Sequence, residues 1–355
     1  MRTSLCRSLF SSLVIGTIGV AVAQGQSALL VGDVVSRETG FPLAHAMVTV
    51  LGAERQTFTS DAGVFAFSAI PPARYRLRVT RIGYVPAELN VEVPAGAAPP
   101  RVRVELTRLS VKLETVRVLA TNVCTSPGRP DPDLNPDFAA IIVQLRLNAE
   151  HYQLLADSFP FSYQVERSQR EMKSDSSRGT PRLDTLNLRT DHRGWTYKMG
   201  EMVERTPQGY VMHLPDLRDF ASYEFLNNHC FRYAGLDSTR DGLVLRIDFR
   251  ADVQIRTPDV NGAIFLDART YQIRRADLEL SKMPPEIRNI TAVHVTTLFR
   301  EISPAIVVIH DVNGINSLRH SRLPWSIVAQ TEDQRMVHFE WLRDDPAHPP
   351  SQPER

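Results

Sequence analysis

The chain has 355 residues, with 41 lysines plus arginines against 40 aspartates plus glutamates. A formal net charge of +1 gives no basis for electrostatic binding to nucleic acid or to an anionic membrane. Hydrophobic residues make up 43% and charged residues 23%, which excludes a disordered chain and a polytopic membrane protein. The 24 prolines and 18 glycines favour short elements joined by many turns.

Residues 1–23 have the pattern of a secretory signal peptide. Arg2 and Arg7 precede an uncharged stretch, residues 9–23, which ends in the small-x-small triplet AVA. This stretch is shorter than the ~20 residues of a spanning helix, so we expect no transmembrane helix in the mature chain. Cys6 lies before the apolar stretch, so we expect no lipid anchor. The sequence predicts export to the periplasm or outer membrane, or secretion.

Two cysteines follow the predicted signal peptide, Cys124 and Cys230. In an exported protein an even pair predicts a disulfide. One alternative is two separate buried thiols. The other is a metal site that includes His229, although the CxxC and HxxxH spacings of such sites are absent. We expect no metal and no cofactor.

Residues 28–108 alternate between apolar and polar side chains with the period of a half-buried strand. In the clearest stretch Tyr75, Leu77 and Val79 alternate with arginines, and turn residues such as Asp61-Ala62-Gly63 separate the stretches. About seven short strands in this length predict a β-sandwich. We interpret the arginine-rich strand face as solvated, with a binding surface as the alternative.

Six spaced elements of this segment resemble the carboxypeptidase regulatory-like domain, a transthyretin-like and Ig-like sandwich. They are Gly32-Asp33-Val34, Thr39-Gly40-Phe41-Pro42-Leu43, Ala46-Met47-Val48-Thr49-Val50, Ser60-Asp61-Ala62-Gly63-Val64-Phe65, Pro72-Ala73-Arg74-Tyr75 and Ile82-Gly83-Tyr84. Ala73 departs from the family, which usually has glycine before the tyrosine. Because related sandwiches bind starch, Phe41 and Tyr84 are candidates for stacking on sugars, with turn or core packing as the alternative.

Residues 109–136 link the sandwich to the second region. Val111, Leu113, Val116 and Val118 form an alternating stretch that resembles the segment following such sandwiches in TonB-dependent outer-membrane receptors. The resemblance implies a docking strand for an envelope partner, and the alternative is a strand of the second domain's own sheet. Residues 125–136 form a proline-rich loop that we expect to pack into neither neighbour.

Residues 137–343 are predicted to form an antiparallel α+β domain with a leading helix. Asn135 as cap and Pro136 at the first position predict a helix that runs to about Asp157. Ten strands are predicted after it, at residues 161–165, 183–188, 195–199, 209–214, 243–249, 263–266, 272–280, 290–299, 305–310 and 336–341. Residues 220–231 predict a short helix that ends near Cys230.

Two stretches of this domain, Gly262 to Asp267 and Tyr271 to Ala276, resemble the half-barrel of the lipoprotein-carrier type. That resemblance implies a curved sheet with an apolar concave side. Two Asp-Val-Asn-Gly stretches, residues 259–262 and 311–314, lack the spacing of a calcium loop and predict hairpin turns. Residues 344–355 are predicted to be a disordered tail.

The sequence contains no GxSxG, HExxH, GxGxxG or phosphate-loop motif. His213-Leu214-Pro215-Asp216 is the nearest approach to the HxxE pair of metallocarboxypeptidases, so the catalytic domain of those enzymes is not represented. We therefore expect a non-enzymatic exported binding or assembly protein of the bacterial envelope, whose partner is an envelope protein or a hydrophobic or carbohydrate ligand. The alternatives are a carbohydrate-binding module and a hydrolase with a dispersed site in the second domain.

Overall fold

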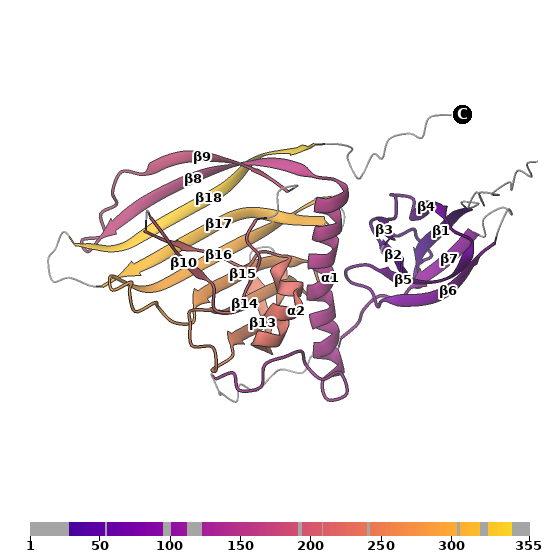
Figure 1. The fold of residues 1–355 in the computed structure, drawn as a ribbon, viewed down its shortest axis with the longest axis horizontal. Helices are drawn as coiled ribbons and strands as arrows, with labels where there is room; N and C mark the ends of the chain where they lie inside the picture. Colours follow the sequence, from indigo (N-terminus) through magenta and orange to yellow (C-terminus); the bar gives the residue numbers. More distant parts are fainter. Residues whose placement is uncertain are drawn as a thin grey trace, which may run out of the picture.

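The computed structural model describes residues 28–53, 55–94, 101–111, 123–190, 194–207, 209–239, 242–303, 306–319 and 326–342. The predicted signal peptide and the predicted tail lie outside these residues. The described chain forms a small β-sandwich and a larger domain around one curved sheet, with a long helix standing between them (Figure 1). Among these residues no helix is both long enough and apolar enough to cross a bilayer.

The first domain is the predicted sandwich of seven strands. They are β1 (Ala28–Ser36), β2 (Met47–Leu51), β3 (Arg55–Phe58), β4 (Val64–Ile70), β5 (Ala73–Thr80), β6 (Ala87–Val93) and β7 (Arg101–Leu106). One sheet has the order β4-β1-β7 and the other β3-β2-β5-β6. Leu77 and Val79 of β5 are fully buried in the core between the sheets, as the alternation predicted.

The arginines of β5 lie on the outer face of their sheet. Arg74 pairs with Glu92 and Arg76 pairs with Glu88, both on β6. These exposed cross-strand pairs neutralise the face, which is the solvated arrangement that the sequence favoured. Ala73 begins β5 and is not among the described residues with positive φ, so alanine is compatible with the backbone at this position.

The second domain begins with helix α1 (Pro136–Ser158), one residue longer than predicted. Pro136 occupies the first turn as expected, but the predicted cap is wrong in detail because the side chain of Asn135 makes no capping hydrogen bond. Ile141, Leu145 and Leu155 are fully buried, so one stripe of the helix packs into the domain.

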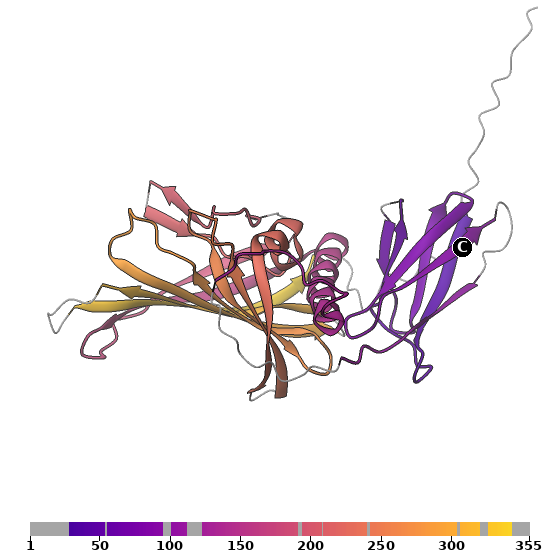
Figure 2. The same ribbon diagram turned by 90° about the horizontal axis from the view of Figure 1, so that it is seen from below.

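A nine-stranded antiparallel sheet forms the body of this domain, in the order β12-β13-β14-β15-β16-β17-β18-β8-β9. Its strands are β8 (Phe161–Lys173), β9 (Arg182–Arg189), β12 (His229–Thr239), β13 (Gly242–Ala251), β14 (Val260–Asp267), β15 (Ile273–Leu280), β16 (Ile290–Ser303), β17 (Ile306–Leu318) and β18 (Ile327–Trp341). The sheet is curved, and α1 lies on its inner side (Figure 2). The architecture is therefore the half-barrel-like α+β domain that was predicted.

Three smaller elements lie on the same side of the sheet as α1. They are the hairpin of β10 (Val203–Thr206) and β11 (Gly209–Met212), the short helix η1 (Asp219–Ala221) and helix α2 (Tyr223–Asn228). The strand predicted at residues 195–199 is wrong, because the backbone N–H of Tyr197 donates to the Asp219 carboxylate instead of to a neighbouring strand. The helix predicted to reach Cys230 ends at Asn228, and Cys230 lies in β12.

The two domains share a buried interface at α1. The side-chain oxygen of Gln144 accepts a hydrogen bond from the backbone N–H of Gly83 (2.7 Å), and its amide nitrogen donates to the carbonyl of Tyr84 (3.1 Å). Ile82, from the same sandwich turn, belongs to the main core of the second domain. Tyr84 therefore lies at the domain interface, whereas the other candidate for sugar stacking, Phe41, is exposed.

Candidate ligand-binding cavity

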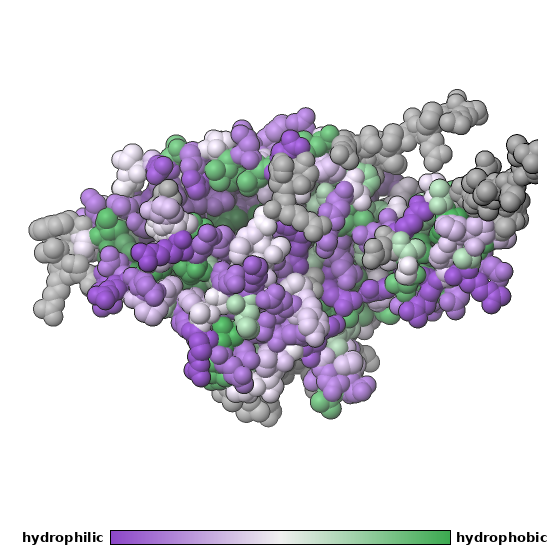
Figure 3. Space-filling model, in the orientation of Figure 1, coloured by the Kyte–Doolittle hydropathy of each residue, from purple (hydrophilic) through white to green (hydrophobic). Residues whose placement is uncertain are grey.

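A cavity of about 820 Å³ lies between the curved sheet and the β10–β11 hairpin, and no described residue of α1 lines it. Its wall combines β8, β16, β17 and β18 with the β10–β11 hairpin and the segment that joins β15 to β16. In the space-filling view apolar side chains lie recessed between polar ones in this region (Figure 3). The cavity is within the size range of small-molecule sites.

One half of the wall is apolar. The sheet and the segment before β16 contribute Leu280, Met283, Ile287, Ile290, Val293, Val295 and Val312. The hairpin and the residues next to it contribute Val203, Tyr210, Val211, Met212 and Leu214. Tyr210 and Val211 are each 43% exposed although they are large apolar side chains. An occupant that covered them would be stabilised by the removal of apolar surface from water.

The hairpin is held at its base. Met202, just before β10, is fully buried, and its carbonyl accepts from the backbone N–H of His213. The His213 ring stacks on Trp195 with 5.0 Å between centroids, and its Nε2 lies 2.8 Å from a carboxylate oxygen of Glu204. These contacts position the apolar face of the hairpin over the cavity.

The other half of the wall is polar and carries a connected set of side chains, called here the Arg167 network. Arg167 on β8 forms a bidentate pair with Asp184 on β9, and one guanidinium nitrogen lies 4.0 Å from Glu332 on β18. The amides of Gln169 and Gln334 each donate to one oxygen of Glu332 at 2.7 Å. Strand register explains the arrangement, because Arg167 is paired with both Asp184 and Gln334, and Gln169 is paired with Glu332.

The Arg167 network keeps its paired groups ionised. The hydrogen bond from Arg167 holds the pKa of Asp184 below its ordinary value, and the same bond raises the pKa of Arg167. Arg167, Asp184 and Glu332 are each about one-third exposed or less. Of this network, Arg167 and Glu332 line the cavity with one guanidinium and one carboxylate, and Arg170, Glu171 and Arg182 are the other charged lining residues.

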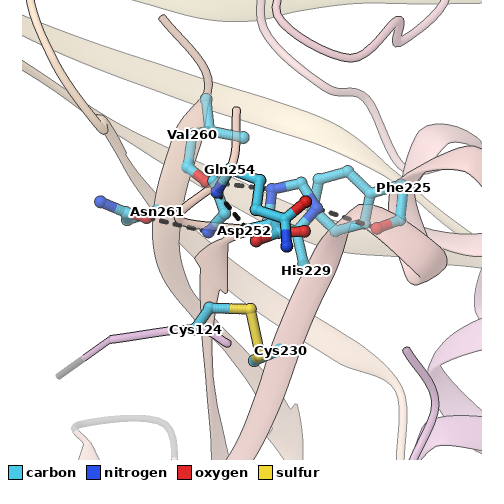
Figure 4. The surroundings of a disulfide bond; sticks show 9 residues. Cys124, Phe225, His229, Cys230, Asp252, Gln254, Val260 and Asn261 are labelled. Atoms are coloured by element: carbon cyan, nitrogen blue, oxygen red, sulfur yellow. Dashed lines mark hydrogen bonds between the residues drawn. A yellow bond between two sulfur atoms is a disulfide. The ribbon is translucent and has the colours of Figure 1, made fainter. Parts of the chain in front are cut away.

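Away from the cavity, the structure contains a disulfide between Cys124 and Cys230 (Figure 4). The two residues are 106 positions apart, and their Cα atoms are separated by 5.5 Å. Backbone bridges join Cys124 to Asp252 and Gly128 to Cys230. This part of the proline-rich loop is therefore fastened to the second domain, which corrects the expectation that the loop packs into neither neighbour.

His229, the candidate partner of a cysteine metal site, lies beside this disulfide but is directed elsewhere. Its Nδ1 lies 2.8 Å from the carbonyl oxygen of Phe225, and its Nε2 lies 3.0 Å from that of Val260 (Figure 4). Within the described ranges, no three side chains of histidine, cysteine, aspartate or glutamate are grouped as metal ligands.

The candidate docking strand is described only at its first residue. Val111 is half-buried and packs against the main core of the second domain. Leu113, Val116 and Val118 lie outside the described residues. The structure brings none of the predicted site residues to the cavity wall.

The polar residues of the cavity were missed by sequence reasoning. The predicted strand from Phe161 stopped at Val165, whereas β8 continues to Lys173 through Arg167 and Gln169. In the sequence, Arg167 and Gln169 are two residues apart, and so are Glu332 and Gln334 of β18. This spacing places each pair on one face of its strand. It identifies a shared face but not the partner strand.

The sandwich strands and the turns between them match a known domain model over residues 30–107. These residues form a carboxypeptidase regulatory-like domain. The match does not include the curved sheet or the cavity. No curated protein matches the chain.

Solved structures give weak likenesses. A cohesin–X-dockerin complex from Acetivibrio cellulolyticus is similar over 22% of this chain and 56% of that chain, with 19% identity and a TM-score of 0.20. A DUF1329 family protein from Desulfovibrio piger is similar over 59% and 96%, with 8% identity and a TM-score of 0.31. A LolA superfamily protein from Nitrosomonas europaea is similar over 57% and 94%, with 11% identity and a TM-score of 0.28. With TM-scores below 0.5, none of these supports a functional argument.

Proposed function

We propose that this chain is a non-enzymatic binding protein of the bacterial cell envelope, and that its cavity holds the apolar chain of an amphipathic ligand. The observation that carries the proposal is the division of one cavity wall into an apolar half and a polar half. An apolar chain would cover the side chains of β16, β17 and the hairpin. The polar end of the same molecule would face the Arg167 network.

The composition of the wall supports binding in preference to catalysis. Its described lining contains no histidine, cysteine or serine, the side chains that most often act as bases and nucleophiles. The Glu332 carboxylate already accepts two amide hydrogen bonds. It is therefore held as part of a structural network rather than directed at a substrate.

Substitution in the hairpin tests the proposal. Val211→Asp places a carboxylate in the apolar wall, where an apolar ligand would have to desolvate it. We expect on the order of tenfold weaker binding of the neutral fluorescent probe N-phenyl-1-naphthylamine, measured by fluorescence titration. Monopalmitoylglycerol is expected to displace the probe from the unmodified protein.

Val337→Asp is the matched control. Val337 on β18 is also 43% exposed, but it does not line the cavity, so its replacement is expected to leave probe binding unchanged. Equal loss of binding in both variants, or no binding by the unmodified protein, would contradict the proposed site. Hydrolysis of the monopalmitoylglycerol ester during the titration would contradict the non-enzymatic part of the proposal.

A further inference from the structure

The polar half of the cavity wall carries charges of both signs. Arg167 and Arg182 contribute two positive charges, and Glu171 and Glu332 contribute two negative charges. Arg170 also belongs to the lining, but it directly precedes Glu171 along β8, so strand alternation directs its side chain to the opposite face of the sheet. The side chains that face the cavity are therefore balanced in charge.

Two of these four charged side chains are used within the Arg167 network. Arg167 donates to both oxygens of Asp184, which lies behind the lining residues. Glu332 accepts one amide hydrogen bond at each of its oxygens, from Gln169 and from Gln334. The network is therefore satisfied by its own members, and a ligand gains little from its charges.

Arg182 and Glu171 are the two charged side chains that remain. Within the described residues, neither the guanidinium nor the carboxylate forms an ion pair or a side-chain hydrogen bond, and both are exposed. Arg182 on the edge strand β9 is paired with Gln169, and Glu171 lies two residues further along β8. Such diagonal neighbours on one face of a sheet are about 7 to 8 Å apart. The wall thus ends in an unpaired cation next to an unpaired anion.

A ligand with a single charge gains little from this arrangement. An anion that pairs with Arg182 is also repelled by the nearby Glu171, and a cation that pairs with Glu171 is repelled by Arg182. A head group that carries both charges a few bonds apart pairs with both side chains. A guanidinium binds a phosphate or carboxylate through paired hydrogen bonds, and a carboxylate attracts an ammonium group.

We infer that the cavity selects an amphiphile with a zwitterionic head group, whose anion pairs with Arg182 and whose ammonium group pairs with Glu171. This inference rests on the proposed function. It adds the chemical class of the head group to the apolar chain that the proposed function assigns. Arg182 and Glu171 are then the residues that determine specificity for the head group.

Three ligands with the same sixteen-carbon chain test the inference. They are zwitterionic hexadecylphosphocholine, anionic hexadecyl sulfonate and cationic hexadecyltrimethylammonium. Each is titrated at low ionic strength against bound N-phenyl-1-naphthylamine, below the concentration at which it aggregates, and monopalmitoylglycerol measures binding through the apolar chain with an uncharged head group. We expect hexadecylphosphocholine to displace the probe about fivefold more effectively than either singly charged ligand, the upper order of effect for an exposed ion pair.

Two single substitutions should change these preferences in opposite ways. Glu171→Gln removes the repulsion of a sulfonate, so the preference for hexadecylphosphocholine over hexadecyl sulfonate should fall to about twofold or less, and the preference over the cation should remain. Arg182→Gln should lower the preference over the cation and keep the preference over the sulfonate. The uncharged probe should bind equally to both variants, which shows that the cavity is intact.

Arg335→Gln and Glu340→Gln are the controls. Both residues lie on β18 outside the cavity lining, with side chains that are 71% and 68% exposed, so both variants should keep the fivefold preferences. Equal or tighter binding of a singly charged ligand to the unmodified protein would overturn the inference, while displacement by monopalmitoylglycerol would still support the cavity as a binding site. Preferences that stay unchanged in Glu171→Gln and Arg182→Gln would overturn the roles of these residues. Failure of all four ligands to displace the probe would overturn the proposed function itself.

Discussion

Three polar side chains of helix α1, Gln144, Asn148 and His151, are almost completely buried. Gln144 bonds the sandwich turn, as described above. The amide nitrogen of Asn148 donates to the carbonyl of Tyr271 at 2.9 Å, and its oxygen accepts from the backbone N–H of Ile273 at 2.9 Å. One helix thus satisfies backbone groups of both the sandwich and the β14–β15 turn, groups that would be costly to bury unpaired.

His151 lies one turn further along α1, where the sandwich covers it. Its ring is 5.7 Å from that of Phe58 on β3, and Nδ1 bonds the carbonyl of Leu147. Burial lowers the pKa of His151 to about 4, with additional lowering by the nearby charges of Arg81 and His45. The folded protein therefore keeps this imidazole neutral.

We predict that His151 makes folding stability decrease as the pH falls from about 6.5 to about 4. In that window the unfolded imidazole takes up a proton that the folded one does not, which costs about 3 kcal/mol in total. Replacement by glutamine removes this dependence. The measurement is the difference in unfolding free energy between the unmodified protein and His151→Gln by urea titration across this pH range.

The unmodified protein has to be compared with His151→Gln because Asp219 changes the pH dependence of folding stability in the opposite direction. Burial raises the pKa of Asp219 to about 6, so the folded state takes up its proton first and gains stability as the pH falls toward 4. This gain partly cancels the loss from His151 in the unmodified protein. A difference between the two proteins that stays constant from pH 7 to pH 4.5 would rule out the assignment to His151. His338→Gln, at an exposed histidine of β18, is the control.

At the scale of elements, the disulfide joins the start of the proline-rich loop to β12. The loop runs beside β12 and the residues after β13, with Gly128 donating to the carbonyl of His229 and Val253 donating to that of Cys124. The disulfide therefore joins segments that already form backbone hydrogen bonds. It also closes a long loop, which constrains the unfolded chain.

We predict that the chain without its predicted signal peptide has no reactive cysteine when unfolded without a reductant. After reduction, two thiols should react with a maleimide reagent, counted by mass spectrometry. Cys124→Ser combined with Cys230→Ser should lower the unfolding free energy by on the order of 4 to 5 kcal/mol, the chain-entropy value for a closed loop of this length. Two reactive thiols in the unreduced protein would refute the disulfide.

At the scale of the whole molecule, the sandwich and the curved sheet are coupled through α1. Gly83, whose φ of +87° suits glycine, brings the sandwich turn within reach of Gln144. A second contact joins the Arg108 guanidinium to the carbonyl of Arg269. Because both cysteines lie after the sandwich, the disulfide does not hold the two domains together.

We predict that Gln144→Leu loosens this coupling. The change leaves the N–H of Gly83 and the carbonyl of Tyr84 without their partner, a cost of about 1 to 3 kcal/mol for each group that stays buried. Limited proteolysis under native conditions should release the sandwich as a fragment faster than from the unmodified protein, even without reductant. Gln164→Leu, on β8 away from the interface, is the control. Equal rates of release in all three proteins would contradict the coupling.

The extent to which the sequence predicts this molecule differs between its parts. The sandwich strands were predictable because each alternates over a short stretch and ends at a turn residue. In the curved sheet the positions of most strands were predicted, but their ends were not. The predicted hairpin at residues 311–314 is wrong, because Asn313 and Gly314 lie inside β17. Hydrogen bonds to β16 and β18 on both sides outweigh the local turn preference of an Asn-Gly pair.

The sequence by itself determined the fold class, the identity of the first domain, the leading helix and the cysteine pair that the structure joins. Each of these depends on a local period or on residue type and context. Only the tertiary structure decided where the cavity lies and which charges face it. Gln169 and Glu332 are 163 residues apart, and their contact exists because β8 pairs with β18, a strand far away in the chain, as well as with β9, its neighbour in the chain. Strand order is a long-range choice that local patterns do not encode, so the sequence could not place the binding wall.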